Sequence, residues 1–377
     1  MKRVVLIRSN AVRNDPAVEK VANALMEAGC KITILAWDRD GKYDGRAELL
    51  PLPQGTAEVI RFGIPAIFGG GIKKNLQSMI KFQSCVKLWL SNNCDRYDVI
   101  HAFDLDTGLV AKNSAKKYKK KLCYHILDFY AASRFREGSL PYRVIAKIEH
   151  AVINHANATI VCTEARKRQI KGSRPKNLTV IHNTPGYIAP NEIEKLDLQS
   201  DRMKIAYVGC FETIRYIKEL IECVAEDERF ELHIGGFGVL EDYVRKSAEA
   251  CERIIFYGKI PYTKVLGLEK ACDVMTALYA PHIANHKYAA PNKVYEAMML
   301  SKPVIMCKNT GWDETVEKYG TGILVDPGKD GLKDGLNALY DKKEYWQVMG
   351  NNAERLYREK YSWSIVKDRI IKLYENL

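Results

Sequence analysis

Long apolar runs are absent from this sequence. No stretch approaches the roughly 18 consecutive apolar residues that a membrane-spanning helix needs, and the first apolar segment is shorter than a secretory signal requires. None of the ten cysteines stands in a Cys-x-x-Cys pair, and most lie within apolar runs. We therefore expect a cytoplasmic protein with reduced cysteines in its core, rather than a zinc site or a disulfide framework.

Two sequence patterns of nucleotide-binding proteins are also missing. No Gly-x-Gly-x-x-Gly follows the first expected strand, which argues against a nicotinamide or flavin dehydrogenase. No segment interleaves arginines with aromatic residues that would stack on bases. A nucleic-acid-binding protein is therefore the least favoured reading, and we expect no nucleic acid partner.

Positive charge is in excess and unevenly placed. The net charge is +12, and residues 1–185 hold 31 Lys and Arg against 16 Asp and Glu, a balance of +15. The remaining residues hold 27 against 30, a balance of −3. A basic first half suits nucleic acid, anionic lipid or a phosphorylated small molecule, and charge alone does not choose among them.

The 377 residues leave room for two domains of about 150 residues each. Short apolar, β-branched runs alternate with helical patterns along the whole chain, which predicts an α/β fold with parallel sheets covered on both faces. The expected strands are residues 3–9, 31–37, 98–103, 121–128, 158–163, 178–183, 204–209, 230–236, 253–258, 274–279, 303–308 and 322–327.

The opening strand–helix–strand unit recurs from residue 203 onward, so we expect two Rossmann-like domains with a cleft between them. The predicted domains are residues 1–185 and 203–360, joined by a linker at 186–202. A last helix at 361–377 is expected to cross back to the first domain. In such sheets ligands bind at the carboxyl ends of the strands.

The segment APNKVYEAMM, residues 290–299, is the most specific pattern. A helix should begin after Pro291, with Lys293 and Glu296 on one face of its first turn. A helix N-terminus beside a lysine suits a phosphate group, and a carboxylate one turn later suits sugar hydroxyls. The alternative is a solvated Lys–Glu pair on an amphipathic helix.

Glycines follow several strands of the second half. Gly209 ends one strand, Gly236 and Gly258 end the next two, and Arg215 stands near the start of the helix after Gly209. Glycine lets backbone approach a ligand closely, and arginine binds phosphate bidentately.

Taken in their order along the chain, the strand-end glycines, Arg215 and the segment 290–299 resemble the donor-binding domain of GT-B glycosyltransferases. The resemblance is to the family-4-like retaining enzymes that use nucleotide-sugars in particular. The resemblance covers residues 203–363 and is weaker over 1–185. It implies that Arg215, Asn292 and Lys293 hold the donor diphosphate and that Glu296 binds the ribose. The backbone after Gly258 would contact the base.

The donor-site residues expected on this basis are Gly209, Arg215, Gly236, Gly258, Lys259, Asn292, Lys293 and Glu296. Arg215 and Lys293 would stabilise the leaving nucleoside diphosphate, so no protein nucleophile is required. The chain departs from the family in having Cys210 after the first glycine and Tyr288 eight positions before Glu296. The second departure leaves the donor sugar open.

The turns of the first half would line the acceptor side. The candidates are Asn10, Arg13, Asp15, His101, Asp104 and Asp128, with Asp106 and His125 beside them. Helix capping is the alternative role for Asp15 and Asp106, and Asn14 is a second candidate cap for the first helix.

Two Asp-x-Asp triplets, residues 38–40 and 104–106, suit a divalent cation on a diphosphate. Both fall in the acceptor half, and Lys and Arg already face the expected phosphates, so we predict no metal and no cofactor besides the nucleotide-sugar co-substrate.

Residues 62–90 combine Phe68, Ile72, Phe82 and Trp89 with Lys73, Lys74, Lys81 and Lys87. This composition suits a surface lying on anionic lipid, and packing of the apolar residues in the core is the alternative.

We therefore predict a metal-independent, retaining glycosyltransferase at the inner face of the cell membrane. It would move a sugar from a UDP-linked donor to a hydroxyl of a glycan or a lipid-linked acceptor in polysaccharide or glycolipid assembly. The alternative within the fold is a nucleotide-sugar epimerase that recruits His101, Asp104 or His125 for acid–base chemistry.

Overall fold

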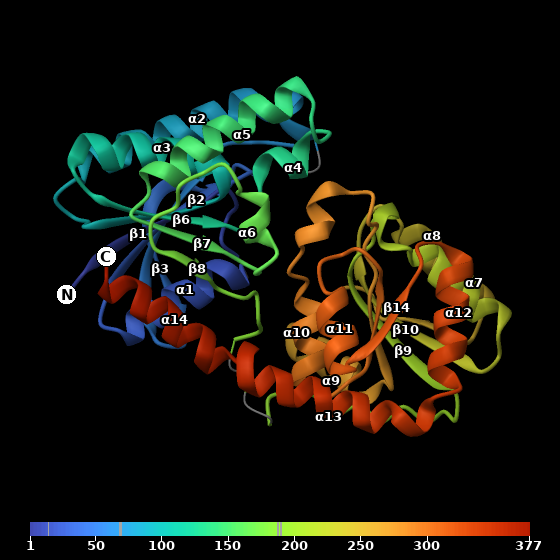
Figure 1. Ribbon diagram of the computed structural model, residues 1–377. Coiled ribbons are helices and arrows are strands. Elements are labelled where there is room, and N and C mark those ends of the chain that lie inside the picture. The colour runs from blue at the N-terminus through green and yellow to red at the C-terminus, as the bar shows by residue number, and fades with distance from the viewer. Residues whose placement is uncertain (14, 68–69, 187, 189–190) are drawn as a thin grey trace. The chain divides into compact units, whose positions relative to one another are not determined.

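The computed structural model of the chain describes residues 1–13, 15–67, 70–186, 188 and 191–377, with the backbone alone for 72 and 73 (Figure 1). The chain forms two compact units. Unit 1 consists of Met1–His182 together with Ser364–Leu377, and unit 2 is Asn183–Trp363. The last helix therefore belongs to unit 1, although unit 2 separates it in sequence from the rest of that unit.

Unit 1 is built around one sheet of eight strands in the order β3-β4-β2-β1-β5-β6-β7-β8. The elements are β1 (Arg3–Arg8), α1 (Pro16–Glu27), β2 (Lys31–Asp38), β3 (Asp44–Leu52), β4 (Gly55–Gly63), α2 (Gly71–Asn92), β5 (Val99–Phe103), α3 (Asp104–Tyr118), β6 (Lys121–Ile126), α4 (Tyr130–Arg134), α5 (Leu140–His155), β7 (Ala158–Val161), α6 (Arg166–Gln169), β8 (Leu178–Val180) and α14 (Trp363–Glu375).

All neighbouring strands of this sheet are parallel except β3 and β4, which form an antiparallel hairpin. The sequence-based prediction contains neither strand. β3 lies at the sheet edge with most of its residues exposed, so it lacks the apolar run that marks the buried strands. The expectation of a purely parallel sheet is therefore wrong for this pair.

Helices cover both faces of the sheet in unit 1. α2, α3 and α5 lie on one face, and α1 and α14 lie on the other (Figure 1). α14 buries Val366, Ile370, Leu373 and Tyr374. Apolar side chains one helical turn apart thus form the stripe that holds this helix to the sheet.

Unit 2 has a sheet of six parallel strands in the order β11-β10-β9-β12-β13-β14. The elements are β9 (Met203–Cys210), η1 (Thr213–Arg215), α7 (Ile217–Glu226), β10 (Phe230–Phe237), α8 (Glu241–Ala250), β11 (Ile254–Phe256), α9 (Tyr262–Ala271), β12 (Val274–Ala277), η2 (Ala284–Tyr288), α10 (Asn292–Met299), β13 (Val304–Cys307), α11 (Asp313–Tyr319), β14 (Gly322–Val325), α12 (Lys329–Tyr340), η3 (Lys343–Tyr345), α13 (Trp346–Leu356) and η4 (Tyr357–Tyr361).

Numbered within the unit, this strand order is 3-2-1-4-5-6, the order of the Rossmann fold. The direction of winding reverses between β9 and β12, and ligands bind such sheets at the carboxyl ends of the strands beside this reversal. The two-domain α/β prediction is confirmed.

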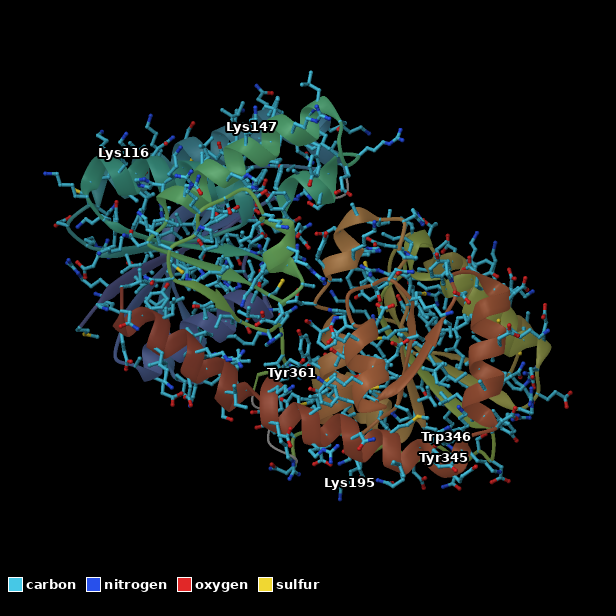
Figure 2. The ribbon with its side chains drawn as sticks, in the orientation of Figure 1. Lys116, Lys147, Lys195, Tyr345, Trp346 and Tyr361 are labelled. Carbon is cyan, nitrogen blue, oxygen red and sulfur yellow. The ribbon has the colours of Figure 1, made fainter. Side chains whose placement is uncertain are left out.

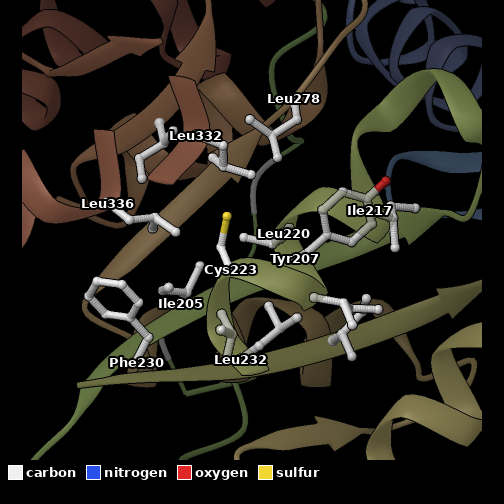
Figure 3. Packing of buried hydrophobic residues seen from close by; sticks show 14 of the residues in the cluster. Ile205, Tyr207, Ile217, Leu220, Cys223, Phe230, Leu232, Leu278, Leu332 and Leu336 are labelled. Atoms are coloured by element: carbon white, nitrogen blue, oxygen red, sulfur yellow. The ribbon is translucent and has the colours of Figure 1, made fainter. Parts of the chain in front are cut away.

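One core cluster of unit 2 lies between the sheet and helices α7 and α12. Figure 3 shows Leu220 and Cys223 of α7 beside Leu332 and Leu336 of α12, all buried. A second cluster joins α10 and α13 to the opposite face of the sheet. All ten cysteines are free and six of them are buried, in agreement with the expected reduced state.

Candidate functional site

Three glycines lie in a row at the ends of β9, β10 and β11. Gly209 and Gly236 are register partners, with φ values of 151° and 141°. A Cβ on Gly236 would stand 1.8 Å from the Gly209 carbonyl oxygen, and the Gly236 amide donates to the Gly258 carbonyl at 2.8 Å. These positions therefore require glycine, and they present backbone rather than side chains at the strand ends.

Lys293 in the first turn of α10 reaches the same edge. Its Nζ lies 2.6 Å from the position that a Cβ on Gly209 would take, and 4.6 Å from the centre of the Tyr207 ring. Burial, and then the neighbouring Arg215, lower the pKa of Lys293 to about 8. No ion pair of Lys293 occurs among the described side chains, so its charge is available to a ligand.

Arg215 ends η1, two residues before α7 begins. Its guanidinium carbon lies 3.7 Å from the centre of the Tyr279 ring, and its Nε lies 3.9 Å from a carboxylate oxygen of Glu212. The Nη1 atom is buried and has no hydrogen-bond partner among the described residues. Arg215 and Lys293 thus place two incompletely paired cations beside the glycine edge, an arrangement that favours an anion.

Glu296, one turn after Lys293, is buried and accepts a hydrogen bond from the Tyr262 hydroxyl at 2.8 Å. The carboxyl of Glu269 is also buried, and burial and the neighbouring Glu296 raise the pKa of Glu269. Because Glu296 is 4% exposed, the alternative of a solvated Lys–Glu pair is wrong.

Lys259 and Asn292 complete the expected donor-site residues. Lys259 follows β11, is exposed, and has its Nζ 5.1 Å from the centre of the Phe237 ring. Asn292 begins α10 and accepts a hydrogen bond from the side-chain amide of Asn183. Both residues flank the edge formed by the three glycines, on the loop after β11 and at the start of α10.

In unit 1, three of the expected acceptor-side residues join one network around Arg8. This arginine forms ion pairs at 2.8 Å with both Asp15 and Asp104. Asp15 also caps α1 by accepting from Ala17 and Val18, and it accepts from the Asn10 side chain at 2.7 Å. The capping alternative is therefore confirmed for Asp15, which at the same time holds Arg8.

His101 does not stand at a strand end, which corrects the sequence-based expectation. It lies in the middle of β5, is fully buried, and hydrogen-bonds Tyr374 at 2.6 Å and His125 at 3.2 Å. Burial lowers the pKa of His101 to about 3 and lowers the pKa of His125 as well. Both imidazoles are neutral core groups beneath α14, so neither contacts a substrate in this structure.

Of the other expected residues of unit 1, Arg13 and Asp128 are exposed and Asp106 is buried. Arg13 has its guanidinium carbon 4.9 Å from the centre of the Tyr43 ring, and Asp128 has a carboxylate oxygen 3.5 Å from Arg166. Asp106 does not cap a helix; its carboxylate accepts from the Ser9 hydroxyl at 3.0 Å.

The two Asp-x-Asp triplets are engaged by the protein itself. Asp38 is buried, and its carboxylate accepts from the backbone amides of Lys42 and Tyr43. Asp104 accepts from the backbone amides of residues 127 and 128 in addition to Arg8. Within the part of the chain that the structure describes, no group of three or more His, Cys, Asp or Glu side chains is arranged to hold a metal ion.

Two family models together cover most of the chain. Residues 15–184 match "Glycosyl transferase 4-like domain", and residues 189–356 match "Glycosyl transferases group 1". The chain is a GT-B glycosyltransferase of the family-4-like group. Its resemblance to that family is thus confirmed over both units.

This glycosyltransferase is similar to curated proteins at low identity. It is 22% identical to an uncharacterized glycosyltransferase of Methanocaldococcus jannaschii, MJ1607, over 74% of this chain and 76% of the relative. It is also 22% identical to the O-antigen chain mannosyltransferase C of Escherichia coli, over 50% of this chain and 54% of the relative.

Solved structures share its fold. The sucrose-phosphate synthase of Thermosynechococcus elongatus has a TM-score of 0.79 at 17% identity, covering 100% of this chain and 98% of that chain. The Anabaena protein Alr3699/HepE in complex with UDP-glucose has a TM-score of 0.71 at 16% identity, with both chains covered fully.

Sequence reasoning missed four residues that contact or adjoin the candidate site residues, namely Tyr207, Tyr279, Tyr262 and Glu269. Tyr207 and Tyr279 look like core residues of two strands, and only the fold places their rings against Lys293 and Arg215. Tyr262 is 34 residues from Glu296 in sequence, and no local pattern links the two.

Proposed function

We propose that this glycosyltransferase binds a nucleotide-sugar, with UDP as the favoured nucleotide, at the glycine edge of unit 2. The observation that carries the proposal is the pair of incompletely neutralised cations, Arg215 and Lys293, beside Gly209 at the winding reversal between β9 and β12. The UDP-glucose complex of the structurally similar Anabaena protein supports the choice of nucleotide.

The chemistry follows from where charge develops. As the bond between the sugar and the diphosphate breaks, negative charge grows on the departing phosphate. Arg215 and Lys293 stabilise that charge, and their contribution is larger in the transition state than in the ground state. Glu296 accepts hydrogen bonds from the ribose hydroxyls. Transfer with retention needs no protein nucleophile, and the two cations take the place of a metal ion at the diphosphate.

The acceptor is a hydroxyl compound held by unit 1, in polysaccharide or glycolipid assembly. Similarity to the O-antigen chain mannosyltransferase C supports this class of pathway. The alternative of an epimerase loses two of its three acid–base candidates, because His101 and His125 are buried in the core of unit 1. The third, Asp104, is held by Arg8 and by the backbone amides of residues 127 and 128.

We further propose that α2 docks on the inner face of an anionic membrane. Among its side chains, Leu76, Ile80 and Leu88 are 46%, 54% and 62% exposed, and Lys81 and Lys87 are exposed between them. Figure 2 shows Lys116 and Lys147 projecting outward from α3 and α5, the helices on the same face of unit 1. Apolar side chains interspersed with lysines suit anionic lipid.

Not every residue expected in that surface takes part. Phe82 is buried and Trp89 is half-buried, so for Phe82 the alternative of core packing is correct. Phe68 and the side chains of Ile72 and Lys73 lie outside the described residues. No helix in the described part of the chain is long and apolar enough to cross a membrane.

A thermal-shift panel of nucleotide-sugars and nucleoside diphosphates tests the donor proposal. A ligand present at 100 times its Kd stabilises the folded protein by about 2.7 kcal/mol. We expect a shift with UDP and with at least one UDP-sugar, and a smaller shift with Glu296→Ala at the same concentrations. A shift with NAD or RNA and with no nucleotide-sugar would overturn the proposal.

A further inference from the structure

A cavity of about 280 Å³ opens in unit 1 where its strands reach their carboxyl ends. Its wall includes Trp37 of β2, Arg39 of the following loop, Gly71 of α2, and Tyr130 and Arg134 of α4. Its size suits one small group at the end of a larger ligand.

Two arginines of this cavity are held by aromatic rings. The guanidinium carbon of Arg39 lies 4.5 Å from the centre of the Trp37 ring, and that of Arg134 lies 4.5 Å from the centre of the Tyr130 ring. A guanidinium stacked in this way keeps its N–H edges free to bind a planar or tetrahedral oxyanion. Both side chains are thus pre-organised for a ligand.

Neither arginine is neutralised by the protein. Arg39 donates from Nη2 to the Ser9 carbonyl at 3.0 Å, and Arg134 donates from Nη1 to the Ser133 hydroxyl at 3.1 Å. The Nε of Arg39 is buried and has no hydrogen-bond partner among the described residues. Over the same residues no ion pair of Arg39 or Arg134 occurs, whereas Arg8 nearby has two.

Asp106 is the carboxylate of the same cavity. It is buried and accepts from the Ser9 hydroxyl, which leaves lone pairs on its carboxylate for a hydroxyl of the ligand. Burial lowers the pKa of Arg39, Asp106 opposes that effect, and the charges of Arg134 and Arg8 lower it further. The cavity thus holds Arg39 together with Arg134, and Asp106 is its one lining carboxylate among the described residues.

We propose that this cavity binds a phosphate group of the acceptor, so that the acceptor is a phosphorylated hydroxyl compound. Arg39 and Arg134 hold the phosphate oxygens through charge-assisted hydrogen bonds, and Asp106 accepts from a neighbouring hydroxyl. This inference rests on the proposed function, which assigns the acceptor to unit 1. Two sources carry the required group, namely a soluble sugar phosphate and a glycolipid joined through phosphate.

Calorimetric titration of the full chain tests the inference, with saturating UDP present to fill the diphosphate site of unit 2. The probes are a hexose 6-phosphate, the same hexose without phosphate, and a water-soluble prenyl phosphate. We expect the chain to bind at least one phosphorylated probe and not the free hexose. Binding of the hexose 6-phosphate assigns a soluble acceptor, and binding of the prenyl phosphate alone assigns a lipid-linked one.

The variants Arg39→Gln and Arg134→Gln should each weaken that binding roughly tenfold to a hundredfold, because each loses a charge-assisted contact. Arg143→Gln is the matched control, since it removes an exposed arginine of α5 that does not line the cavity. It should bind the probe as the parent chain does, and Arg134→Lys should recover part of the loss.

UDP affinity, measured on the same samples, separates this inference from the proposed function. We expect it to be the same in all four variants. A parent chain that binds UDP but no phosphorylated probe would overturn the phosphate assignment, as would equal probe binding by the parent and both glutamine variants. A parent chain that binds no nucleotide would instead overturn the proposed donor site.

Discussion

Lys293 combines partial burial with a neighbouring arginine, and both depress the pKa of its ammonium group to about 8. In the free protein its charge is therefore present at pH 7 and mostly lost at pH 9. We expect the affinity for UDP to fall about tenfold between these pH values, because only the charged form binds the diphosphate well.

The variant Lys293→Arg is the control for this pH dependence, since arginine stays charged throughout the range. The affinity of this variant for UDP should change with pH only as much as titration of UDP itself causes. Titrations at pH 7, 8 and 9 measure both proteins. If the parent chain and Lys293→Arg have the same pH profile, Lys293 does not face the diphosphate.

Arg215 and Glu296 should have separable kinetic effects. In the proposed function Glu296 binds the ribose equally in the ground state and the transition state, so Glu296→Ala should weaken the binding of donor and free UDP together. The loss of one charge-assisted bond, about 1.5–3 kcal/mol, corresponds to roughly tenfold to a hundredfold. Arg215→Ala should lower kcat more than it raises the donor KM, because its partner gains charge in the transition state.

Arg215→Lys should keep part of the rate, since it retains the charge without the bidentate geometry. Initial rates at varied donor concentration give both constants. Near-parental kinetics in both alanine variants would show that these side chains do not contact the donor.

At the scale of single elements, α2 exposes apolar side chains beside lysines, whereas the solvent face of an ordinary surface helix is polar. We expect the chain to sediment with anionic vesicles and not with neutral ones. Replacing Lys74, Lys81 and Lys87 with glutamine should weaken this binding roughly a hundredfold, at about 1 kcal/mol for each cation.

The matched control replaces Lys318, Lys342 and Lys343 of unit 2 with glutamine, which changes the net charge equally away from α2. That variant should sediment as the parent chain does. Equal sedimentation of the parent chain with anionic and neutral vesicles would exclude docking through these lysines.

The elements that the sequence predicts well are those whose pattern is local. Buried strands such as β1 and β9 are continuous apolar runs, and α1 has its cap at Asp15 and its stop at Gly29. The sequence did not predict the hairpin of β3 and β4, because β3 is an exposed edge strand without an apolar run.

The candidate site of unit 2 was likewise predictable only where its sequence pattern is local. The spacing of Lys293 and Glu296 predicts one helix face, but their partners come from other elements. Glu296 meets Tyr262 of α9, and Lys293 meets the ring of Tyr207 of β9. His101 shows the opposite error, because an ionisable residue near a strand end looked functional and proved to be core.

On the scale of the whole molecule, each unit should respond separately to ligand and to mutation. Tyr374 of α14 is buried and hydrogen-bonds His101 in unit 1, whereas the proposed nucleotide site belongs to unit 2. Tyr374→Phe leaves a buried imidazole nitrogen unpaired, which costs about 1–3 kcal/mol. We expect this variant to lower the thermal stability of unit 1 and to leave the affinity for UDP unchanged.

Hydrogen exchange read by mass spectrometry resolves the two units. Peptides of β5 and β6 should lose protection in Tyr374→Phe, while those of β9 and β10 keep it, and UDP should protect only the latter. The replacement Tyr340→Phe in unit 2 is a control that removes a hydroxyl far from α14 in sequence. Uniform loss of protection over both units would contradict this division.

Unit 1 contains residues 364–377, and this affects how the unit folds while the chain is being synthesised. The strands of unit 1 and α1 emerge first, but α14, the second helix on the same face, emerges only after all of Asn183–Trp363. At about 5–20 residues per second, that interval lasts on the order of ten to forty seconds. During it, the part of the sheet that α14 covers, with His101 and Tyr374's other neighbours, lacks this helix in the nascent chain.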